Sequence, residues 1–170
     1  MTDAASVPPA QVLWQQISLP IGSALIGRTE DGALCRLSFL ESQTVQETLT
    51  VWQKSWPRTG FKPDPTPVSA FDLKCLPILL IGTAFQRRVW QMILAIPEGA
   101  TETYGSLAAR LGVPRVARAV GGACGANPIL YRIPCHRVIL SNGKRGGFSG
   151  GETLKQKILE SEKRRLHRLP

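Results

Sequence analysis

The sequence predicts two parts: a small α/β domain over residues 1–80, with an antiparallel sheet and a helix, and a mostly α-helical domain over residues 81–170 that contains a helix-turn-helix. Alternating apolar residues between turn signals dominate the first part, whereas apolar residues at helical spacing dominate the second. The charge is divided in the same way, since residues 1–80 carry a net charge of −1 and residues 81–170 carry +10. A chain of 170 residues is long enough for two small domains or one of ordinary size.

The first part begins with a predicted hairpin. Residues 12–17 and 23–28 read as strands joined at Pro20-Ile21-Gly22, and Asp31-Gly32 is a strong signal for a tight turn into the next strand. In that next strand Cys35 alternates with Arg36, and side chains in a strand alternate between the two faces. We therefore expect Cys35 to face the core.

A helix and an irregular connection complete this part. Apolar residues at i, i+4, i+7 and i+11 predict an amphipathic helix that ends at Pro57; they are Val45, Leu49, Trp52 and Trp56. Residues 57–67 hold four prolines and are predicted to be irregular. The apolar run 76–81 fits either a buried strand or a linker. Nothing in residues 1–80 indicates chemistry.

The second part opens with a helix. Thr83 and Gln86 form a capping-box pattern that starts a helix through about residue 95. Its predicted inner stripe is Phe85, Val89 and Ile93, and Pro97-Glu98-Gly99 ends it.

Two short helices follow with a brief link between them, which predicts a helix-turn-helix. Thr103 caps the first, Gly112 stops it, and Pro114 suits the first turn of the second. Val116, Ala117 and Val120 are expected to face inward in the second helix. Arg115, Arg118 and Gly122 fall on a different stripe, where arginines beside a glycine allow close approach to a phosphate backbone. The alternative is an ordinary helical pair with exposed arginines.

The net charge of +9 comes from the second part of the chain. Such an asymmetry is typical of a half that binds a polyanion, such as nucleic acid. A solvated basic surface is the alternative. Charge of this kind indicates affinity for phosphate, not a reaction.

The remaining composition points to a cytoplasmic protein. The sequence has no secretory signal pattern and no apolar run long enough to span a membrane. Its four cysteines, Cys35, Cys75, Cys124 and Cys135, show no C-x-x-C spacing. With two histidines in the chain, a structural zinc site is not expected, and reduced thiols fit the cytoplasm better than disulfides do.

The run Ile133-Pro134-Cys135-His136-Arg137-Val138 carries the chemistry, because a thiolate is a strong nucleophile. Adjacent residues cannot be assumed to form a direct dyad, so a bridging water is expected between Cys135 and His136. The imidazole then needs a third group to fix its tautomer. Glu162 follows Leu154 and Ile158 at intervals of four on the last helix, whereas Glu160 points outward. Glu162 could orient His136 or simply pair with a basic residue.

These segments together resemble the O6-alkylguanine-DNA alkyltransferases. The motifs that carry the resemblance run in order through the second part: Thr83-Ala84-Phe85-Gln86, Val89-Trp90, Ile96-Pro97, Tyr104-Gly105, Arg118-Ala119-Val120-Gly121-Gly122-Ala123, Asn127-Pro128, Ile133-Pro134-Cys135-His136-Arg137-Val138 and Gly150-Gly151. Pro-Cys-His-Arg at this place is highly specific. Residues 1–80 are similar, with a weaker signal, to the RNase H-like accessory domain of that family.

The resemblance implies DNA repair by direct reversal of damage. The alkyl group moves irreversibly from O6-alkylguanine to Cys135, so that one protein molecule repairs one lesion. Such proteins bind duplex DNA from the minor groove and rotate the damaged base out of the stack. The resemblance implies no metal and no other cofactor. It also implies a monomer, with cooperative binding along DNA left open.

The resemblance also implies residue roles. Cys135 is the nucleophile, His136 is its base through water, Glu162 orients His136, and Asn127 ties the recognition segment to the active-site turn. Tyr104 donates to a ring nitrogen of the base and Ser149 contacts the guanine oxygen. Tyr104, Val138, Phe148 and Ser149 bind the substrate, and Arg118, Arg115, Ala117, Gly121 and Gly122 bind DNA. Arg118 fills the space that the base vacates, and Arg137 holds the turn through an ion pair.

The sequence departs from the family pattern at a few positions. Phe148 stands where a tyrosine is common, and Leu130-Tyr131-Arg132 stands where smaller or apolar residues are usual. Two other functions remain open. One is a sensor that binds alkylated DNA through an inert Cys135, and the other is a cysteine hydrolase. The hydrolase is disfavoured because the other histidine, His167, lies near the chain terminus.

Overall fold

In the computed structural model, residues 2–5, 7–41, 43–144 and 146–166 are described. The chain divides into two compact units. Residues 1–83 and 128–130 form the first unit, and residues 84–127 and 131–170 form the second. No helix in the described ranges is long and apolar enough to cross a membrane.

The first unit is built on a six-stranded sheet with the order β1-β6-β4-β3-β2-β5. The strands are β1 (Thr2–Ala5), β2 (Gln11–Leu19), β3 (Gly22–Arg28), β4 (Leu34–Phe39), β5 (Gly60–Pro63) and β6 (Ile78–Ile81). β2, β3 and β4 are antiparallel neighbours, whereas β1 and β4 pair with β6 in parallel and β5 pairs with β2 in parallel. The hairpins predicted at Pro20-Ile21 and Asp31-Gly32 are confirmed, and Gly32 has the positive φ of 89° that favours glycine.

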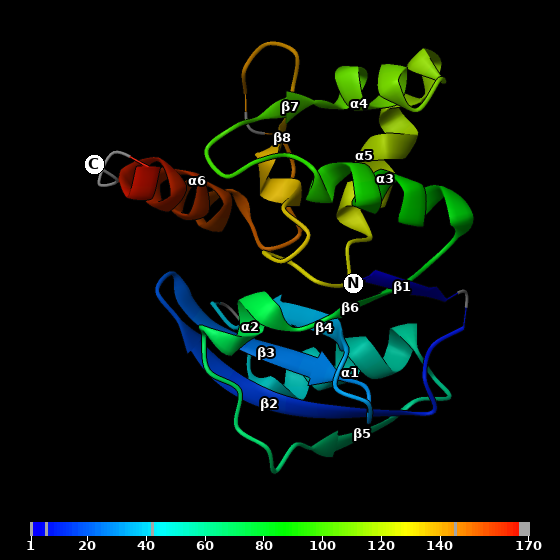
Figure 1. Cartoon of the computed structure of the whole chain (residues 1–170), viewed down its shortest axis with the longest axis vertical. Coiled ribbons are helices and arrows are strands. Elements are labelled where there is room, and N and C mark those ends of the chain that lie inside the picture. The colour runs from blue at the N-terminus through cyan, green and yellow to red at the C-terminus, as the bar shows by residue number, and fades with distance from the viewer. Residues whose placement is uncertain (1, 6, 42, 145, 167–170) are drawn as a thin grey trace. The chain divides into compact units, whose positions relative to one another are not determined.

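Helix α1 (Val45–Ser55) lies along one face of this sheet (Figure 1). The Thr44 hydroxyl accepts a hydrogen bond from the Glu47 backbone, and the Glu47 carboxylate accepts one from the Thr44 backbone, which completes a capping box. Trp52 and Trp56 are buried, as the helical spacing predicts. The helix ends in front of Pro57, where the sequence predicts its end.

Strand β4 is buried on both faces, which the alternation pattern does not predict. Cys35 is fully buried, as expected, but Arg36 is buried too. Its guanidinium lies 3.7 Å from the centre of the Trp56 ring and donates to the Ser55 hydroxyl. Trp52 of α1 and Trp56 at its end therefore cover the face from which Arg36 projects, and the arginine is accommodated by cation–π contacts.

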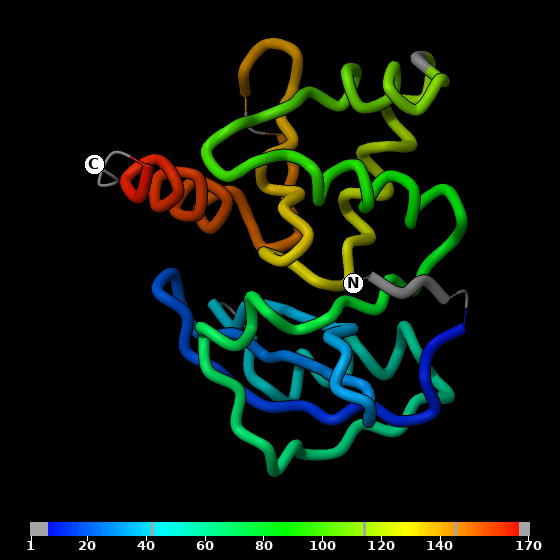
Figure 2. Tube along the Cα trace, in the orientation of Figure 1, coloured from blue at the N-terminus to red at the C-terminus, as the bar shows by residue number. Residues whose placement is uncertain are grey.

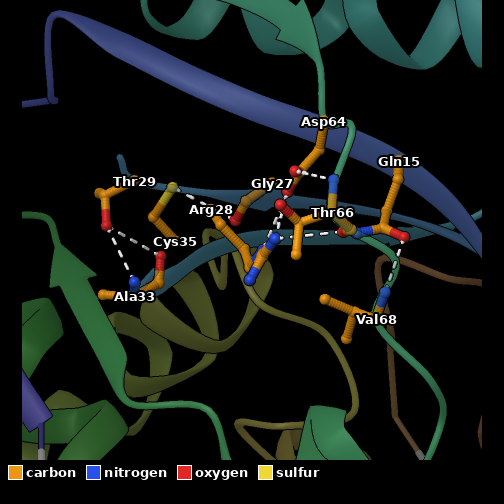
Figure 3. A network of polar contacts seen from close by, with 9 residues as sticks. All are labelled: Gln15, Gly27, Arg28, Thr29, Ala33, Cys35, Asp64, Thr66 and Val68. Atoms are coloured by element: carbon orange, nitrogen blue, oxygen red, sulfur yellow. Dashed lines mark hydrogen bonds and ion pairs between the residues drawn. The ribbon is translucent and has the colours of Figure 1, made fainter. Parts of the chain in front are cut away.

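The prediction that residues 57–67 are wholly irregular is wrong at β5, which pairs with β2. Figure 3 shows the polar contacts that hold the following residues against the sheet. The Arg28 Nε donates to the Asp64 carboxylate over 3.0 Å, and the Gln15 Nε2 donates to the Thr66 carbonyl over 2.9 Å. The Val68 backbone donates to the Gln15 Oε1 over 3.0 Å. These partners are 36 to 53 residues apart in the chain, so local spacing could not predict them.

The apolar run at 76–81 contains β6 and is therefore a strand. A short helix that was not predicted, α2 (Asp72–Cys75), precedes it. In addition, the Leu37 backbone bonds to the Pro128 carbonyl, which attaches residues 128–130 to the first unit.

The second unit is mostly helical. Its helices are α3 (Ala84–Leu94), α4 (Tyr104–Arg110), α5 (Ala117–Gly125) and α6 (Glu152–Leu166). Two-residue strands β7 (Glu102–Thr103) and β8 (Val138–Ile139) pair in parallel, and 3-10 turns occur at Pro114–Val116 and Cys135–Arg137. α3 contributes the buried Val89, Trp90 and Ile93 to the core, and the Trp90 Nε1 donates to the Ala123 carbonyl of α5 over 2.8 Å.

The ends of α4 are as predicted, but the start of α5 is not. The Thr103 hydroxyl caps α4 by accepting from the Ser106 backbone, and Gly112 has a positive φ of 76° just after the helix. Pro114 begins a separate 3-10 turn, and α5 begins only at Ala117.

This later start changes which face of α5 is buried. Val120, Ala123 and Cys124 form the buried stripe, whereas Val116 and Ala117, which were expected to face inward, are half-buried. Arg115, Arg118 and Gly122 are exposed, as predicted.

Candidate active site

Cys135, the predicted nucleophile, lies in a tight turn after Pro134. The Arg137 backbone bonds to the Pro134 carbonyl over 2.9 Å, which closes a 3-10 turn around Cys135 and His136. The Asn127 side chain donates to the Ile133 carbonyl over 2.9 Å and to the Cys135 Sγ over 3.0 Å. Asn127 therefore fixes the turn and the sulfur together, and a hydrogen bond to sulfur favours its thiolate form.

Cys135 opens onto a cavity of about 570 Å³, although the residue as a whole is only 2% exposed. The cavity is predominantly apolar, and its volume is in the range of small-molecule sites. It is lined by Tyr104, Ala117, Arg118, Gly121, Cys124, Gly125, Cys135, Leu140, Gly147, Phe148 and Ser149. The thiol is thus buried from bulk solvent but faces a space large enough for a nucleobase.

A buried ion-pair cluster holds the other side of the turn. The His136 Nε2 and the Glu162 Oε1 are 2.9 Å apart, and the Arg137 Nε lies 3.1 Å from each Glu162 oxygen. The Gly99 backbone donates to Glu162 over 3.2 Å, and the Arg137 Nη1 donates to the Ile96 carbonyl over 2.6 Å. Figure 2 shows the turn and α6 side by side. Glu162 therefore contacts both His136 and Arg137, the two pairings that the sequence left as alternatives.

The electrostatics of this cluster determine the His136 tautomer. Although burial raises the pKa of Glu162, hydrogen bonds from His136 and Arg137 lower it to about 2, so the group is a carboxylate at neutral pH. Burial lowers the pKa of His136, which favours the neutral imidazole. Because a carboxylate only accepts, the imidazole proton is on Nε2. The buried Nδ1 has no hydrogen-bond partner among the described residues and is left as an acceptor.

The Cys135 thiol is protonated in the free protein. Burial raises its pKa to about 11, while the Asn127 hydrogen bond and the Lys155 charge act in the opposite direction. A thiol with so high a pKa needs a base before it can attack. A neutral histidine in the next position is a suitable base, provided that a water bridges the two groups.

Lys155 is a functional candidate that the sequence analysis missed. Its side chain is fully buried in α6, and its Nζ donates to the Val138 carbonyl over 2.7 Å. Its positive charge favours a thiolate at Cys135. The sequence did contain a signal that Lys155 is buried. Lys155 precedes Glu162 by seven residues, so the two side chains lie on the same face of the helix.

Three of the predicted substrate-binding residues line the cavity, and one does not. The Tyr104 hydroxyl donates to the Gly147 carbonyl over 3.4 Å, and burial raises the pKa of this phenol to about 12, which keeps it a proton donor. Phe148 is half-buried, and the Ser149 hydroxyl donates to the Gly125 carbonyl over 2.9 Å. Val138 is fully buried outside the lining, so it does not face the cavity with its side chain.

The predicted DNA-binding residues divide into two groups. Ala117, Arg118 and Gly121 line the cavity, whereas Arg115 and Gly122 are exposed away from it. Cys124, which the sequence analysis did not single out, also lines the cavity. His167 lies outside the described residues.

The four cysteines are unpaired. In the described ranges, no group of three His, Cys, Asp or Glu side chains is arranged to hold a metal ion.

Comparisons with known proteins agree on one family. Residues 84–164 match the family model described as 6-O-methylguanine DNA methyltransferase, DNA binding domain. A Mycobacterium tuberculosis protein named methylated-DNA–protein-cysteine methyltransferase is 38% identical over 81% of this chain and 92% of its own length. A Methanosarcina barkeri protein of the same name is 39% identical over 88% of this chain and 96% of its own length.

Solved structures give the same result. The crystal structure of the Mycobacterium tuberculosis O6-methylguanine methyltransferase matches with a TM-score of 0.72 and 35% identity, over 94% of this chain and 95% of that one. The structure of Mycobacterium tuberculosis OGT in complex with DNA matches with a TM-score of 0.72 and 37% identity, over 91% of this chain and 94% of that one.

Proposed function

Because this chain belongs to the methylated-DNA–protein-cysteine methyltransferase family, we propose that it repairs DNA by moving the alkyl group of O6-alkylguanine onto its own Cys135. The observation that carries the proposal is the position of the Cys135 sulfur. It borders a base-sized cavity, accepts a hydrogen bond from Asn127, and is followed in the chain by a neutral histidine that Glu162 orients.

The transfer is an in-line displacement. A water passes the thiol proton of Cys135 to the His136 Nδ1, and the resulting imidazolium is stabilised by Glu162. The thiolate attacks the alkyl carbon, so a carbon–sulfur bond forms as the bond to the guanine oxygen breaks. Asn127 and Lys155 stabilise the negative charge on sulfur before it attacks. The thioether product has no hydrolysable bond, so each molecule reacts once.

The leaving base gains negative charge and benefits from proton donors at the cavity wall. Tyr104, whose raised pKa keeps it protonated, donates to a ring nitrogen. Ser149 is exposed and redirects its hydroxyl to the guanine oxygen, and Phe148 stacks on the base. Val138 contributes through its backbone, which Lys155 holds in place.

The DNA-binding surface is α5 and the turn before it. We take α4 and α5 as a helix-turn-helix that enters the minor groove, so that Ala117, Gly121 and Gly122 allow close approach. Arg115 holds a phosphate, and Arg118 occupies the space left by the rotated base. The first unit, residues 1–80 by sequence, is the RNase H-like accessory domain, and residues 81–170 are the reactive domain. A cytoplasmic location and a monomeric state stay predictions.

The proposal is tested by incubating the protein with duplex DNA that carries a radiolabelled methyl group on the guanine O6. Label is expected to move to the protein, to reach one methyl group per molecule and to stop there. Peptide mass spectrometry should find the methyl group on Cys135. Label that stays in DNA bound by the protein would identify a sensor, and continued turnover on an acyl substrate would identify a hydrolase; either result contradicts the proposal.

Arg118→Ala is expected to slow repair of duplex DNA by about 100-fold while leaving the reaction with free O6-methylguanine base within about threefold of wild type. Arg118 is exposed beside the cavity, so its loss affects the energy of the extruded base rather than the chemistry. Single-turnover rates with the two substrates measure the effect. Arg164→Ala, an exposed arginine of α6 outside the helix-turn-helix, is the matched control and should leave both rates unchanged. Equal slowing with both substrates would argue against a role in base extrusion.

A further inference from the structure

Tyr131 has an unusual backbone conformation for a bulky residue. Its φ is +71°, and among the described residues it is the one non-glycine residue with a positive φ. This left-handed region is strained for a bulky side chain and free of strain for glycine. Non-glycine residues in this region tend to occur at functional sites, where the surrounding structure holds them.

The Tyr131 side chain is directed at the catalytic histidine. Its ring is stacked on the His136 imidazole, with ring centres 6.4 Å apart and planes at 22°. Phe148 meets the same imidazole at a right angle, with centres 6.3 Å apart. At the other end of the Tyr131 side chain, its hydroxyl lies near the Arg165 guanidinium of α6, whose pKa it raises. Tyr131 is therefore held by its own backbone and by α6, and it presents a fixed aromatic face to His136.

The hydrogen bond to Glu162 does not fix the imidazole by itself. A ring that is held at one nitrogen can still tilt about that bond, which would move its second nitrogen. A stacked ring limits the tilt, because aromatic pairs have preferred geometries. The fully buried His136 also depends on the half-buried Tyr131 for part of its cover from solvent.

We propose that Tyr131 is a positioning residue for His136, which fixes the plane of the imidazole so that Nδ1 can take the proton of Cys135 and which keeps bulk water off the ring. The inference rests on the proposed function, because it assigns Tyr131 a part in the same proton transfer.

The pKa of His136 is a readout that a purely structural role of Tyr131 would not change. Burial lowers its pKa, Glu162 raises it, and Arg137 and Lys155 lower it. Cys135 precedes it in the same turn. Removing the Tyr131 ring reduces the burial and leaves the charged groups in place, so the pKa of His136 should rise toward its ordinary value of 6.5.

The experiment compares wild type with Tyr131→Gly and Tyr131→Phe, all carrying His167→Gln so that one imidazole remains to be followed by NMR. Tyr131→Gly relieves the left-handed strain but loses the packing of the ring, so thermal unfolding is measured first to show that the protein is folded at the assay temperature. Its methyl-transfer rate should fall about tenfold at neutral pH. The acidic limb of its pH–rate profile and the NMR pKa of His136 should both move to higher pH. Tyr131→Phe keeps the ring and should keep the wild-type pKa and profile.

Two results would overturn the inference. One is a Tyr131→Gly protein with the wild-type rate, and the other is a slower protein whose pH–rate profile and His136 pKa are unmoved. The wild-type arm separates these results from a failure of the proposed function, because that failure would show as no methyl transfer by any of the three proteins.

Discussion

Replacing Cys135 by alanine is expected to abolish methyl transfer from O6-methylguanine in duplex DNA while leaving the protein folded and able to bind that DNA. No other group at the cavity can replace the thiol. Burial raises the pKa of Cys124 to about 12, and the Tyr104 phenol is also held protonated. A protonated thiol or phenol is a weak nucleophile unless a base takes its proton, and neither Cys124 nor Tyr104 is followed in the chain by a histidine, as Cys135 is. The substitution removes one sulfur atom and the hydrogen bond from Asn127, so it should cost no more than about 2 kcal/mol of stability.

Cys124→Ala is the matched control, because Cys124 is a second buried thiol that lines the same cavity. It should transfer methyl groups at a rate close to that of wild type. Protein-bound label after incubation with methylated DNA measures the reaction, and a gel-shift assay measures binding. Label on the Cys135→Ala protein, or loss of labelling in the Cys124→Ala protein, would contradict the assignment of the nucleophile.

The parts of the fold that local spacing encodes could be predicted from the sequence. The cap at Thr103 and the stop at Gly112 bound α4 because each acts within about four residues of the chain. Glu162 could be placed on the buried face of α6 because Leu154 and Ile158 precede it at intervals of four. These features depend on the chain's own geometry and need no knowledge of distant partners.

The features that were missed depend on partners far away in the sequence. Alternation placed Arg36 on the face opposite Cys35, and that face is covered by Trp52 of α1 and by Trp56, which follows the helix. Lys155 was not singled out, because its partner, the Val138 carbonyl, is 17 residues away. Alternation and helical spacing show which residues share a face, but they do not show what packs on that face.

The candidate site shows the same division. The motif at Cys135 and the spacing of Glu162 in α6 were enough to predict that Glu162 could contact His136 next to the thiol, and the structure shows that contact. The cavity, by contrast, is formed by α5 together with Tyr104 and the segment around Phe148, which the fold brings to one place. That Cys124 lines this cavity and that Tyr131 stacks on His136 could be seen only in the structure.

Glu162→Ala is expected to destabilise the protein by about 3 to 5 kcal/mol and to slow methyl transfer by about 100-fold. The Glu162 carboxylate is 1% exposed and accepts hydrogen bonds from His136, Arg137 and the Gly99 backbone. Its removal leaves the Arg137 guanidinium without its buried counter-charge and the imidazole without the group that fixes its tautomer. Urea denaturation measures the first effect, and single-turnover rates measure the second.

Glu160→Ala, on the exposed face of the same helix, is the matched control and should change the stability by less than about 0.5 kcal/mol. The loss of stability in Glu162→Gln should be smaller than in Glu162→Ala and larger than in Glu160→Ala. The neutral amide keeps the shape of the carboxylate but not its charge.

The acid dependence of stability gives Glu162 a distinctive signature. Its pKa falls from an ordinary 4.5 to about 2 in the folded protein. A lowered carboxyl pKa contributes stability that is complete above pH 4.5 and is lost as the pH falls from 4.5 toward 2. The contribution is on the order of 3 kcal/mol. The difference in unfolding free energy between wild type and Glu162→Ala should therefore shrink through this window. A difference that stays constant from neutral pH to about pH 3 would mean that Glu162 is not the buried counter-charge on which the active-site turn depends.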